Sequence, residues 1–425
     1  MTDHELEERL RAWYRSEIPA DEVAPADLRS SLAAITRAPS ARLRRFRSGR
    51  GLALLAAAAL LGVLGGTAGI GRFLDSRPEP IPAIWSITGR TTDAHYAHTA
   101  TLLLDGRVLI AGGDGDIPTD STELYDSATG SWNATDRMNQ GRSMHTATLL
   151  PDGRVLVAGG VGVDLGAQSS AELFDAATGT WTITGTMLHA RHGHTATLLP
   201  DGRVLVAGGA TDAGHSAAAE LYDPETGTWI STDGLLSARA FHTATLLPDG
   251  TVLVAGSSDE AVARSAELYD PRLGTWTASG SMTHGRMNFT ATLLPGGVVL
   301  AAGGAGDASS EIYDPRSGTW SATGSMLSGR FGNHAAVLLP DGTVLVTGGH
   351  SGTLDVGLQE LSAAEIYDSA RRTWTATAPM GTARRWHTAT VLPVGTVLVV
   401  GGASGDDTSQ SAELYGAPDG QGQHP

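Results

Sequence analysis

Short apolar runs separated by turn residues recur along most of the chain. The stretch HTATLLPDGRVLVAGG occupies residues 145–160 and returns unchanged at 194–209. It predicts an inner strand HTATLL, a tight turn at Pro-Asp-Gly and a second strand RVLVAGG. The motif AELYD then predicts a third strand, and a turn of the type Asp-Pro-x-Thr-Gly leads into a fourth strand near a tryptophan. Because the apolar runs are nearly continuous, we expect these strands to be covered on both faces.

The tryptophans give the period of this pattern. They are spaced by 47, 49, 48, 47, 44 and 54 residues, and each unit also contains a glycine doublet, with a serine as its second member in the fourth unit. Repeats near 50 residues are typical of a propeller in which each repeat forms one four-stranded blade. The positions that we predict to be structural are Trp85, Trp132, Trp181, Trp229, Trp276, Trp320, Trp374 and the doublets Gly112, Gly113, Gly159, Gly160, Gly208, Gly209, Gly303, Gly304, Gly348, Gly349, Gly401 and Gly402.

The two ends of the repeat region determine the number of blades. There are seven inner-strand units, and no tryptophan follows the last one, whereas Trp85 precedes the first unit and has no blade of its own. If the Trp85 strand completes the last blade, the ring closes without free edges. We therefore expect an all-β, seven-bladed propeller over residues 85–416, closed by its N-terminal strand and followed by a disordered tail at 417–425.

An uncharged segment precedes the repeats. GLALLAAAALLGVLGGTAGI, at 51–70, is long enough to cross a bilayer as a helix. Five arginines stand close before it and two follow, so the positive-inside rule places the N-terminus in the cytoplasm and the propeller outside the cell membrane. We predict a short helical, Arg-rich cytoplasmic segment at 1–50, a single transmembrane anchor at 51–71 and a linker at 72–84. A cleaved signal peptide is the alternative.

The charge of the chain is unevenly distributed. Residues 1–77 contain 12 Arg and 9 acids, a net charge of +3, so the total of −16 leaves −19 for residues 78–425. An acidic surface argues against nucleic acid as a partner, because binding to phosphates needs positive charge. The chain has no cysteine, which excludes disulfides and thiolate chemistry, and its use of arginine without lysine suggests a bacterial origin.

A glycine doublet, then a spaced tyrosine, then a tryptophan resembles the kelch repeat, and the resemblance extends from Trp85 to about Gly416. Galactose oxidase is a seven-bladed relative whose copper is held in part by histidines that open inner strands. Its mechanism also needs a tyrosine bonded to a cysteine sulfur, so the resemblance implies a galactose-oxidase-like propeller without the copper-radical site. Six histidines open inner strands here: His98, His145, His194, His242, His334 and His387.

The recurrence of this histidine favours a structural role. A catalytic ligand is needed in two or three places, whereas this residue occurs in nearly every blade and is replaced by Phe289 in the fifth. We retain only His98 and His387 as candidate metal ligands. We expect no cofactor, and we predict no catalytic residue.

The loops between second and third strands are candidates for a recognition surface. The residues between doublet and glutamate number 9, 11, 10, 9, 6, 15 and 10, although the remaining spacings are nearly constant. A constant scaffold with one variable face is typical of recognition by loops. The candidate ligand-binding residues near this face are Tyr96, Phe241 and Trp386, beside the histidines, and Arg142, Arg191, Arg239, Arg286, Arg330 and Arg384, three or four positions before them. The arginines either bind carboxylate or sulfate groups or tie blades together through acidic partners.

The sequence thus favours a membrane-anchored, extracytoplasmic binding module that recognises a protein, a peptide or a glycan through its loop face. One alternative is a metal-dependent oxidase or a carbohydrate-active enzyme. Another is a transmembrane sensor with a cytoplasmic regulatory partner.

Overall fold

The computed structural model describes residues 83–114, 117–352, 359–405 and 407–416. Every regular element within them is a β-strand, and these residues include no helix long and apolar enough to cross a membrane. The predicted segments 1–50, 51–71 and 417–425 lie outside the described residues. Of the predicted linker only Ala83 and Ile84 are described, and Ile84 already belongs to the first strand.

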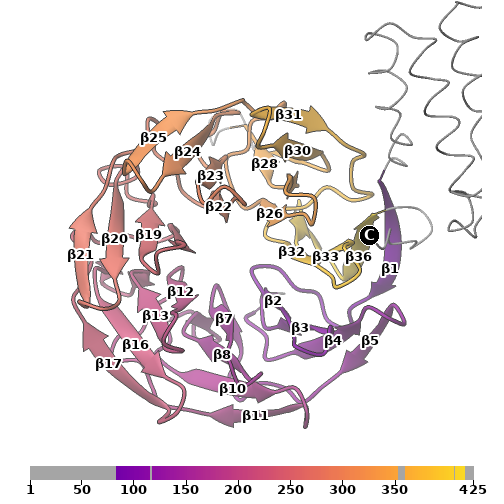
Figure 1. Cartoon of the computed structure of the whole chain (residues 1–425). Helices are drawn as coiled ribbons and strands as arrows, with labels where there is room; N and C mark the ends of the chain where they lie inside the picture. The colour runs from indigo at the N-terminus through magenta and orange to yellow at the C-terminus, as the bar shows by residue number, and fades with distance from the viewer. Residues whose placement is uncertain (1–82, 115–116, 353–358, 406, 417–425) are drawn as a thin grey trace, which may run out of the picture. The chain divides into compact units, whose positions relative to one another are not determined.

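The described chain forms seven antiparallel four-stranded sheets arranged as blades around an axis (Figure 1). Blade 1 consists of β2 (Thr99–Leu102), β3 (Val108–Ala111), β4 (Thr122–Asp126) and β5 (Ser131–Ala134). Blade 2 consists of β7 (Thr146–Leu149), β8 (Val155–Ala158), β10 (Ala171–Asp175) and β11 (Thr180–Ile183). Blade 3 consists of β12 (Thr195–Leu198), β13 (Val204–Ala207), β16 (Ala219–Asp223) and β17 (Thr228–Thr232).

The other blades repeat this order from the axis outward. Blade 4 consists of β18 (Thr243–Leu246), β19 (Val252–Ala255), β20 (Ala266–Asp270) and β21 (Thr275–Ala278). Blade 5 consists of β22 (Thr290–Leu293), β23 (Val299–Ala302), β24 (Ser310–Asp314) and β25 (Thr319–Ala322). Blade 6 consists of β26 (Ala335–Leu338), β27 (Val344–Thr347), β30 (Ala364–Asp368) and β31 (Thr373–Ala376). Blade 7 consists of β32 (Thr388–Val391), β33 (Val397–Val400), β36 (Ser411–Gly416) and β1 (Ile84–Arg90).

Blade 7 joins the two ends of the repeat region, as the sequence predicts. β1 pairs antiparallel with β36, and this register places Trp85 opposite Tyr415. The rings of these two residues lie 5.0 Å apart, as do the corresponding pairs in other blades, such as Tyr222 and Trp229. The prediction of seven blades closed by the N-terminal strand is therefore confirmed.

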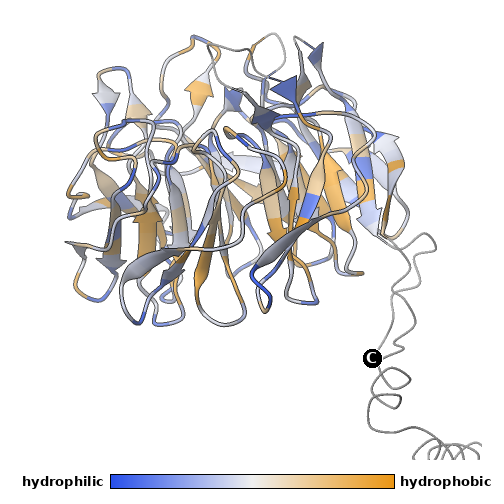
Figure 2. Cartoon of the chain, turned by 90° about the horizontal axis from the view of Figure 1, so that it is seen from above, coloured by the Kyte–Doolittle hydropathy of each residue, from blue (hydrophilic) through white to orange (hydrophobic). Residues whose placement is uncertain are grey.

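The hydrophobic core lies between neighbouring blades. The second strand of every blade is buried along its whole length, for example Val155–Ala158 in β8. Leu156 and Leu173 of blade 2 pack in one cluster with Val206 and Trp229 of blade 3. The nearly continuous apolar runs in the sequence have this origin, because each blade is covered on both faces by its neighbours. Figure 2 shows hydrophobic residues concentrated along the strands.

One side of the disc carries the connections between second and third strands, and we call it the loop face. These connections occupy 112–121, 159–170, 208–218, 256–265, 303–309, 348–363 and 401–410. Short strand pairs form on this face: β6 (Arg142–Ser143) with β9 (Val161–Gly162), β14 (Ala210–Thr211) with β15 (Gly214–His215), β28 (His350–Ser351) with β29 (Gln359–Glu360), and β34 (Ala403–Ser404) with β35 (Asp407–Thr408).

Candidate functional site

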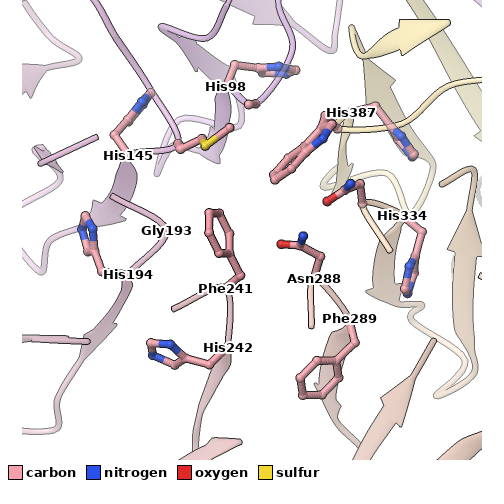
Figure 3. A pocket seen from close by; sticks show the side chains of 14 residues that line it. His98, His145, Gly193, His194, Phe241, His242, Asn288, Phe289, His334 and His387 are labelled. Carbon is pink, nitrogen blue, oxygen red and sulfur yellow. The ribbon is translucent and has the colours of Figure 1, made fainter. Parts of the chain in front are cut away.

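A cavity of about 270 Å³ lies on the axis where the inner strands begin (Figure 3). Each blade contributes two consecutive residues to its wall: the residue that opens the inner strand, usually histidine, and the residue before it, which we call the axial residue. Figure 3 shows the axial residues Phe241 and Asn288 inside the circle formed by the strand-opening residues. The seven axial residues are Ala97, Met144, Gly193, Phe241, Asn288, Asn333 and Trp386.

The axial residues are joined into a closed ring by their backbones. Each axial N–H donates a hydrogen bond to the carbonyl oxygen of the axial residue in the preceding blade, with N–O distances of 2.9–3.1 Å. The bond from Ala97 N–H to Trp386 O closes the circle at 3.1 Å. This geometry requires the left-handed backbone region, and the axial φ angles range from 48° to 57°. The ring therefore imposes the same unusual conformation on seven positions of different sequence.

Because the axial backbone is left-handed, large side chains at these positions point to a functional role. A left-handed backbone costs a residue other than glycine about 1–2 kcal/mol, and a bulky residue there is an outlier. Gly193 fulfils the same backbone role with φ 57°, so the ring itself does not need the side chains of Phe241 (φ 55°) or Trp386 (φ 56°). Strain of this kind tends to persist at functional sites. The axial side chains are accordingly the first candidates for contact with a ligand.

The strand-opening histidines connect neighbouring blades. His194 Nε2 lies 3.0 Å from Thr146 Oγ1 of the preceding inner strand, and His242 repeats this contact with Thr195 at 3.1 Å. The candidate metal ligands do the same, since His98 Nε2 lies 2.9 Å from Thr388 Oγ1 and His387 Nε2 lies 2.8 Å from a threonine of the preceding blade. The Nδ1 atoms are buried and have no hydrogen-bond partner among the described residues. A neutral ring that donates from Nε2 fits these surroundings best.

Burial keeps these histidines uncharged at neutral pH. Desolvation lowers the pKa of His145, His242 and His334 to about 3, and in each case the nearby arginine of the same blade adds to this effect. The pKa of the other three strand-opening histidines is also lowered, again chiefly by burial. The cavity wall therefore carries no positive charge from these rings.

The strand-opening side chains explain why the glycine doublet recurs in nearly every blade. A Cβ atom on Gly159 would lie 2.6 Å from Arg191 O and 2.8 Å from His194 Cε1 of the next blade. The imidazole thus packs directly on the doublet of its neighbour. Phe289 takes this place in blade 5, where it approaches Gly256 in the same way.

The arginines near the loop face are buried inside the blades. Arg191 is 0% exposed, and its guanidinium donates to Gly208 O at 2.7 Å, Ala218 O at 2.7 Å and Glu220 Oε1 at 2.6 Å. The other five candidates, Arg142, Arg239, Arg286, Arg330 and Arg384, are also 0% exposed and pair with the glutamate of their own third strand. This placement fits the structural tie that the sequence left open. It corrects the expectation of a ligand-binding ring, because none of these six guanidinium groups reaches the surface.

Blade 1 has a histidine in place of this arginine. His95 is 0% exposed, and its Nδ1 lies 2.6 Å from Gly112 O while its Nε2 lies 3.4 Å from Glu123 Oε1. These contacts match those of the arginines with the doublet carbonyl and the glutamate. In blade 1, His95 therefore takes the structural role that the buried arginine has in the other blades.

The aromatic candidates separate into two groups. Phe241 and Trp386 line the axial cavity. Tyr96 lies outside its wall, and its hydroxyl donates to Asp114 Oδ2 at 3.3 Å on the loop face. Met144, Asn288 and Asn333 also line the cavity, and they are not among the candidates predicted from the sequence. A signal was available, because the residue before the strand opening differs between blades although HTATLL is almost constant.

The connections on the loop face are acidic. Their described residues include one arginine, Arg264, and nine acids, which gives a net charge of −8 (+1 − 9). The nine acids are Asp114, Asp120, Asp164, Asp212, Asp259, Glu260, Asp307, Glu360 and Asp407. Arg385, which directly precedes the wall residue Trp386, is half-buried, and its charge is neutralised by an ion pair with Glu360.

Comparisons with known proteins agree with this architecture. A family model described as the KLHDC2/KLHL20/DRC7 Kelch-repeats domain matches residues 97–304, and the Kelch motif matches residues 332–381. A solved structure of a fungal alcohol oxidase of the AA5 family, in complex with copper, is similar with a TM-score of 0.67 and 20% identity. The likeness covers 79% of this chain and 76% of that chain, and at this identity it shows the fold alone. No curated protein matches the chain.

The residues of this chain do not fit a copper site of the kind that the oxidase fold implies. The Nε2 atoms of the strand-opening histidines already bond to threonines or a backbone carbonyl, and the chain has no cysteine for a modified tyrosine. The described residues also contain no group of three or more His, Asp and Glu side chains that could hold a metal ion. We therefore derive no copper-dependent step.

Proposed function

The chain belongs to the kelch-repeat β-propeller family, and from this premise we propose that it is a binding module that holds a protein, peptide or glycan over the axial cavity of its loop face. The observation that carries the proposal is the contrast within the repeats. Positions that build the blades recur almost unchanged, whereas the axial residues and the surrounding loops differ from blade to blade. A surface that varies on a constant scaffold is suited to recognition.

The residues of the cavity wall support a binding role rather than a catalytic one. Its fourteen residues include no carboxylate, no hydroxyl and no exposed cation, and its histidines are engaged in the blade contacts described above. It offers instead apolar and aromatic surface with two amide side chains. Such a mixture of apolar area and few polar groups is typical of ligand pockets.

We further propose that the propeller is tethered outside the cell membrane by the apolar segment at 51–71. The support is the sequence, in which twenty uncharged residues follow an arginine-rich stretch. A reporter enzyme that is active only outside the cytoplasm, fused after Pro425, is expected to be active. An inactive reporter, together with an active cytoplasmic reporter at the same site, contradicts this topology.

The binding proposal is tested with the purified full-length chain and immobilised peptide and glycan libraries. We expect at least one ligand class to be retained by the wild type and released by the double variant Phe241→Gly and Trp386→Gly. Glycine is the matched choice, because Gly193 shows that the backbone ring accepts it. Leu273→Ala is the control, since Leu273 is 72% exposed in the turn between the third and fourth strands. Retention that is indifferent to the axial variants contradicts the proposal.

A further inference from the structure

The chemistry of the axial cavity indicates which kind of ligand it takes. Its aromatic surface comes from Phe241 and Trp386, beside the polarisable side chain of Met144. Aromatic rings attract cations through their negative faces, and tryptophan does so most strongly. Both rings are held at positions where the backbone favours glycine, so the backbone ring does not require them. Phe241 also packs beside His192, with ring centroids 6.1 Å apart.

The polar atoms of the cavity wall add to this preference. Asn333 Oδ1 is buried and has no hydrogen-bond partner among the described residues. A carbonyl oxygen accepts hydrogen bonds and cannot donate them, and a buried acceptor without a partner costs about 1–3 kcal/mol. A ligand that brings N–H donors into the cavity would satisfy this oxygen. Asn288 supplies a second amide close to the axis (Figure 3).

The residues of the cavity wall carry no positive charge, and acidic residues surround the opening of the cavity. The six arginines that precede the strand openings by three or four residues are fully buried and paired with glutamates, and Arg385, beside Trp386, is paired with Glu360. The strand-opening histidines are neutral because burial lowers their pKa. The connections around the opening carry the net charge of −8 described above, and Asp164 and Asp212 are among their exposed acids. A wall without competing cations inside an acidic rim attracts positive ligands.

From these features together we propose that the axial cavity binds an organic cation, such as the side-chain ammonium group of a lysine in a peptide. The inference rests on the proposed binding function and names its ligand chemistry. The cation lies against Phe241 and Trp386 and donates to Asn333 Oδ1, while the rim acids guide it to the opening. With about 270 Å³, the cavity takes one side chain or one small cation rather than a folded segment.

The test compares two short capped peptides that differ at one position. The probe is acetyl-Gly-Gly-Lys-Gly-Gly-amide, and its control carries norleucine in place of lysine, which keeps the carbon chain and removes the charge. Dissociation constants for the full-length chain are measured by saturation-transfer NMR. We expect the lysine peptide to bind about tenfold more tightly, as a desolvated cation–π contact predicts. At 1 M salt the advantage should shrink, because the exposed rim acids are screened, but it should not vanish, because the contact inside the cavity is screened much less.

Variants of the aromatic rings identify the site. Phe241→Leu and Trp386→Leu keep apolar volume but remove the π face, so each is expected to weaken lysine binding severalfold and to leave norleucine binding unchanged. Leu273→Ala is expected to change neither. Titration with tetramethylammonium chloride distinguishes the source: tighter binding of the salt than of the peptide assigns a free cation as ligand, and the reverse assigns a peptide.

Equal or tighter binding of the norleucine peptide overturns the inference. The inference is also overturned if Phe241→Leu and Trp386→Leu leave the binding of the lysine peptide and of tetramethylammonium unchanged. Preference for a neutral glycan or an acidic peptide in the library experiment, if the axial variants abolish it, also overturns the inference but leaves the binding function intact. Absence of binding to every library overturns both.

Discussion

Replacement of Arg286 by methionine tests the view that the arginines near the loop face are internal ties. Methionine retains most of the apolar stem and removes the charge. The guanidinium of Arg286 donates to Gly303 O at 2.7 Å, to Ser309 O at 3.2 Å, to Ser309 Oγ at 3.0 Å and to Glu311 Oε1 at 2.8 Å. All of these bonds are lost, and Glu311 becomes a buried carboxylate without its counter-ion.

The size of the stability loss depends on the hydrogen bonds that Glu311 retains in the variant. Removal of one partner of a buried ion pair costs about 3–5 kcal/mol. Glu311 retains two backbone donors, the N–H groups of Thr283 at 2.7 Å and His284 at 3.3 Å, which continue to stabilise its charge. We therefore expect a loss near the lower limit, about 3 kcal/mol, in the free energy of unfolding at pH 7.

The deficit should depend on pH in a defined direction. Burial acts to raise the pKa of Glu311, but the Thr283 N–H and the Arg286 guanidinium outweigh it and hold the pKa below its ordinary value of 4.5. The ionised carboxylate thus contributes stability above pH 4.5, and the wild type loses this contribution as the pH falls through the lower folded pKa. The variant can protonate Glu311 without losing an ion pair, so the difference between the two proteins should shrink below about pH 4.5.

Urea unfolding followed by circular dichroism measures these differences. Arg272→Met is the matched control, because Arg272 is 76% exposed and its pair with Asp270 is a surface pair worth less than about 1 kcal/mol. A deficit for Arg286→Met as small as that of the control refutes the structural tie. Loss of ligand binding without loss of stability would also refute it, since it would return Arg286 to the role of a ligand contact.

Three further changes probe the blade contacts and the ring closure. Burial holds the pKa of His242 at about 3, so the stability that the neutral ring contributes is present above about pH 6.5 and is lost on acidification. His242→Phe imitates Phe289 and removes this titration. In urea unfolding, the variant should therefore show a pH slope of stability between pH 6 and 4 that is lower by about 1.4 kcal/mol per pH unit. Deletion of residues 84–90 exposes the edge of β36, and size-exclusion chromatography should show aggregation in place of a monodisperse species. Gly208→Ala brings a Cβ to within 2.7 Å of His242 Cε1 at φ 64° and should cost more than about 2 kcal/mol, whereas Gly296→Ala, with no atom within 4 Å, should change stability by less than about 0.5 kcal/mol.

The axial cavity shows where sequence reasoning stops short. Phe241 and Trp386 could be selected because aromatic residues beside a repeated histidine are conspicuous in the sequence. Met144, Asn288 and Asn333 do not stand out, since none of them is unusual within its own repeat. What they share is the position directly before the strand opening, where the residue varies between repeats.

For the arginines the sequence leaves two interpretations open. Their regular spacing is compatible with a ring of exposed donors and with a set of internal ties. The partner of Arg191 is Glu220, and such a pairing within a blade depends on how the third strand lies against the incoming loop. Residue spacing gives no information about that burial, so the sequence alone is compatible with both interpretations.

The all-β architecture, the seven blades and the closing role of the Trp85 strand can be read from the chain alone. These features depend on local turn chemistry and on a period that occurs seven times, so each repeat supports the same answer. Which side chains are available to a ligand depends instead on how the blades pack around the axis. The axial residues lie 45–53 positions apart in the sequence, and they meet only because the closed ring brings the start of every inner strand to one axis.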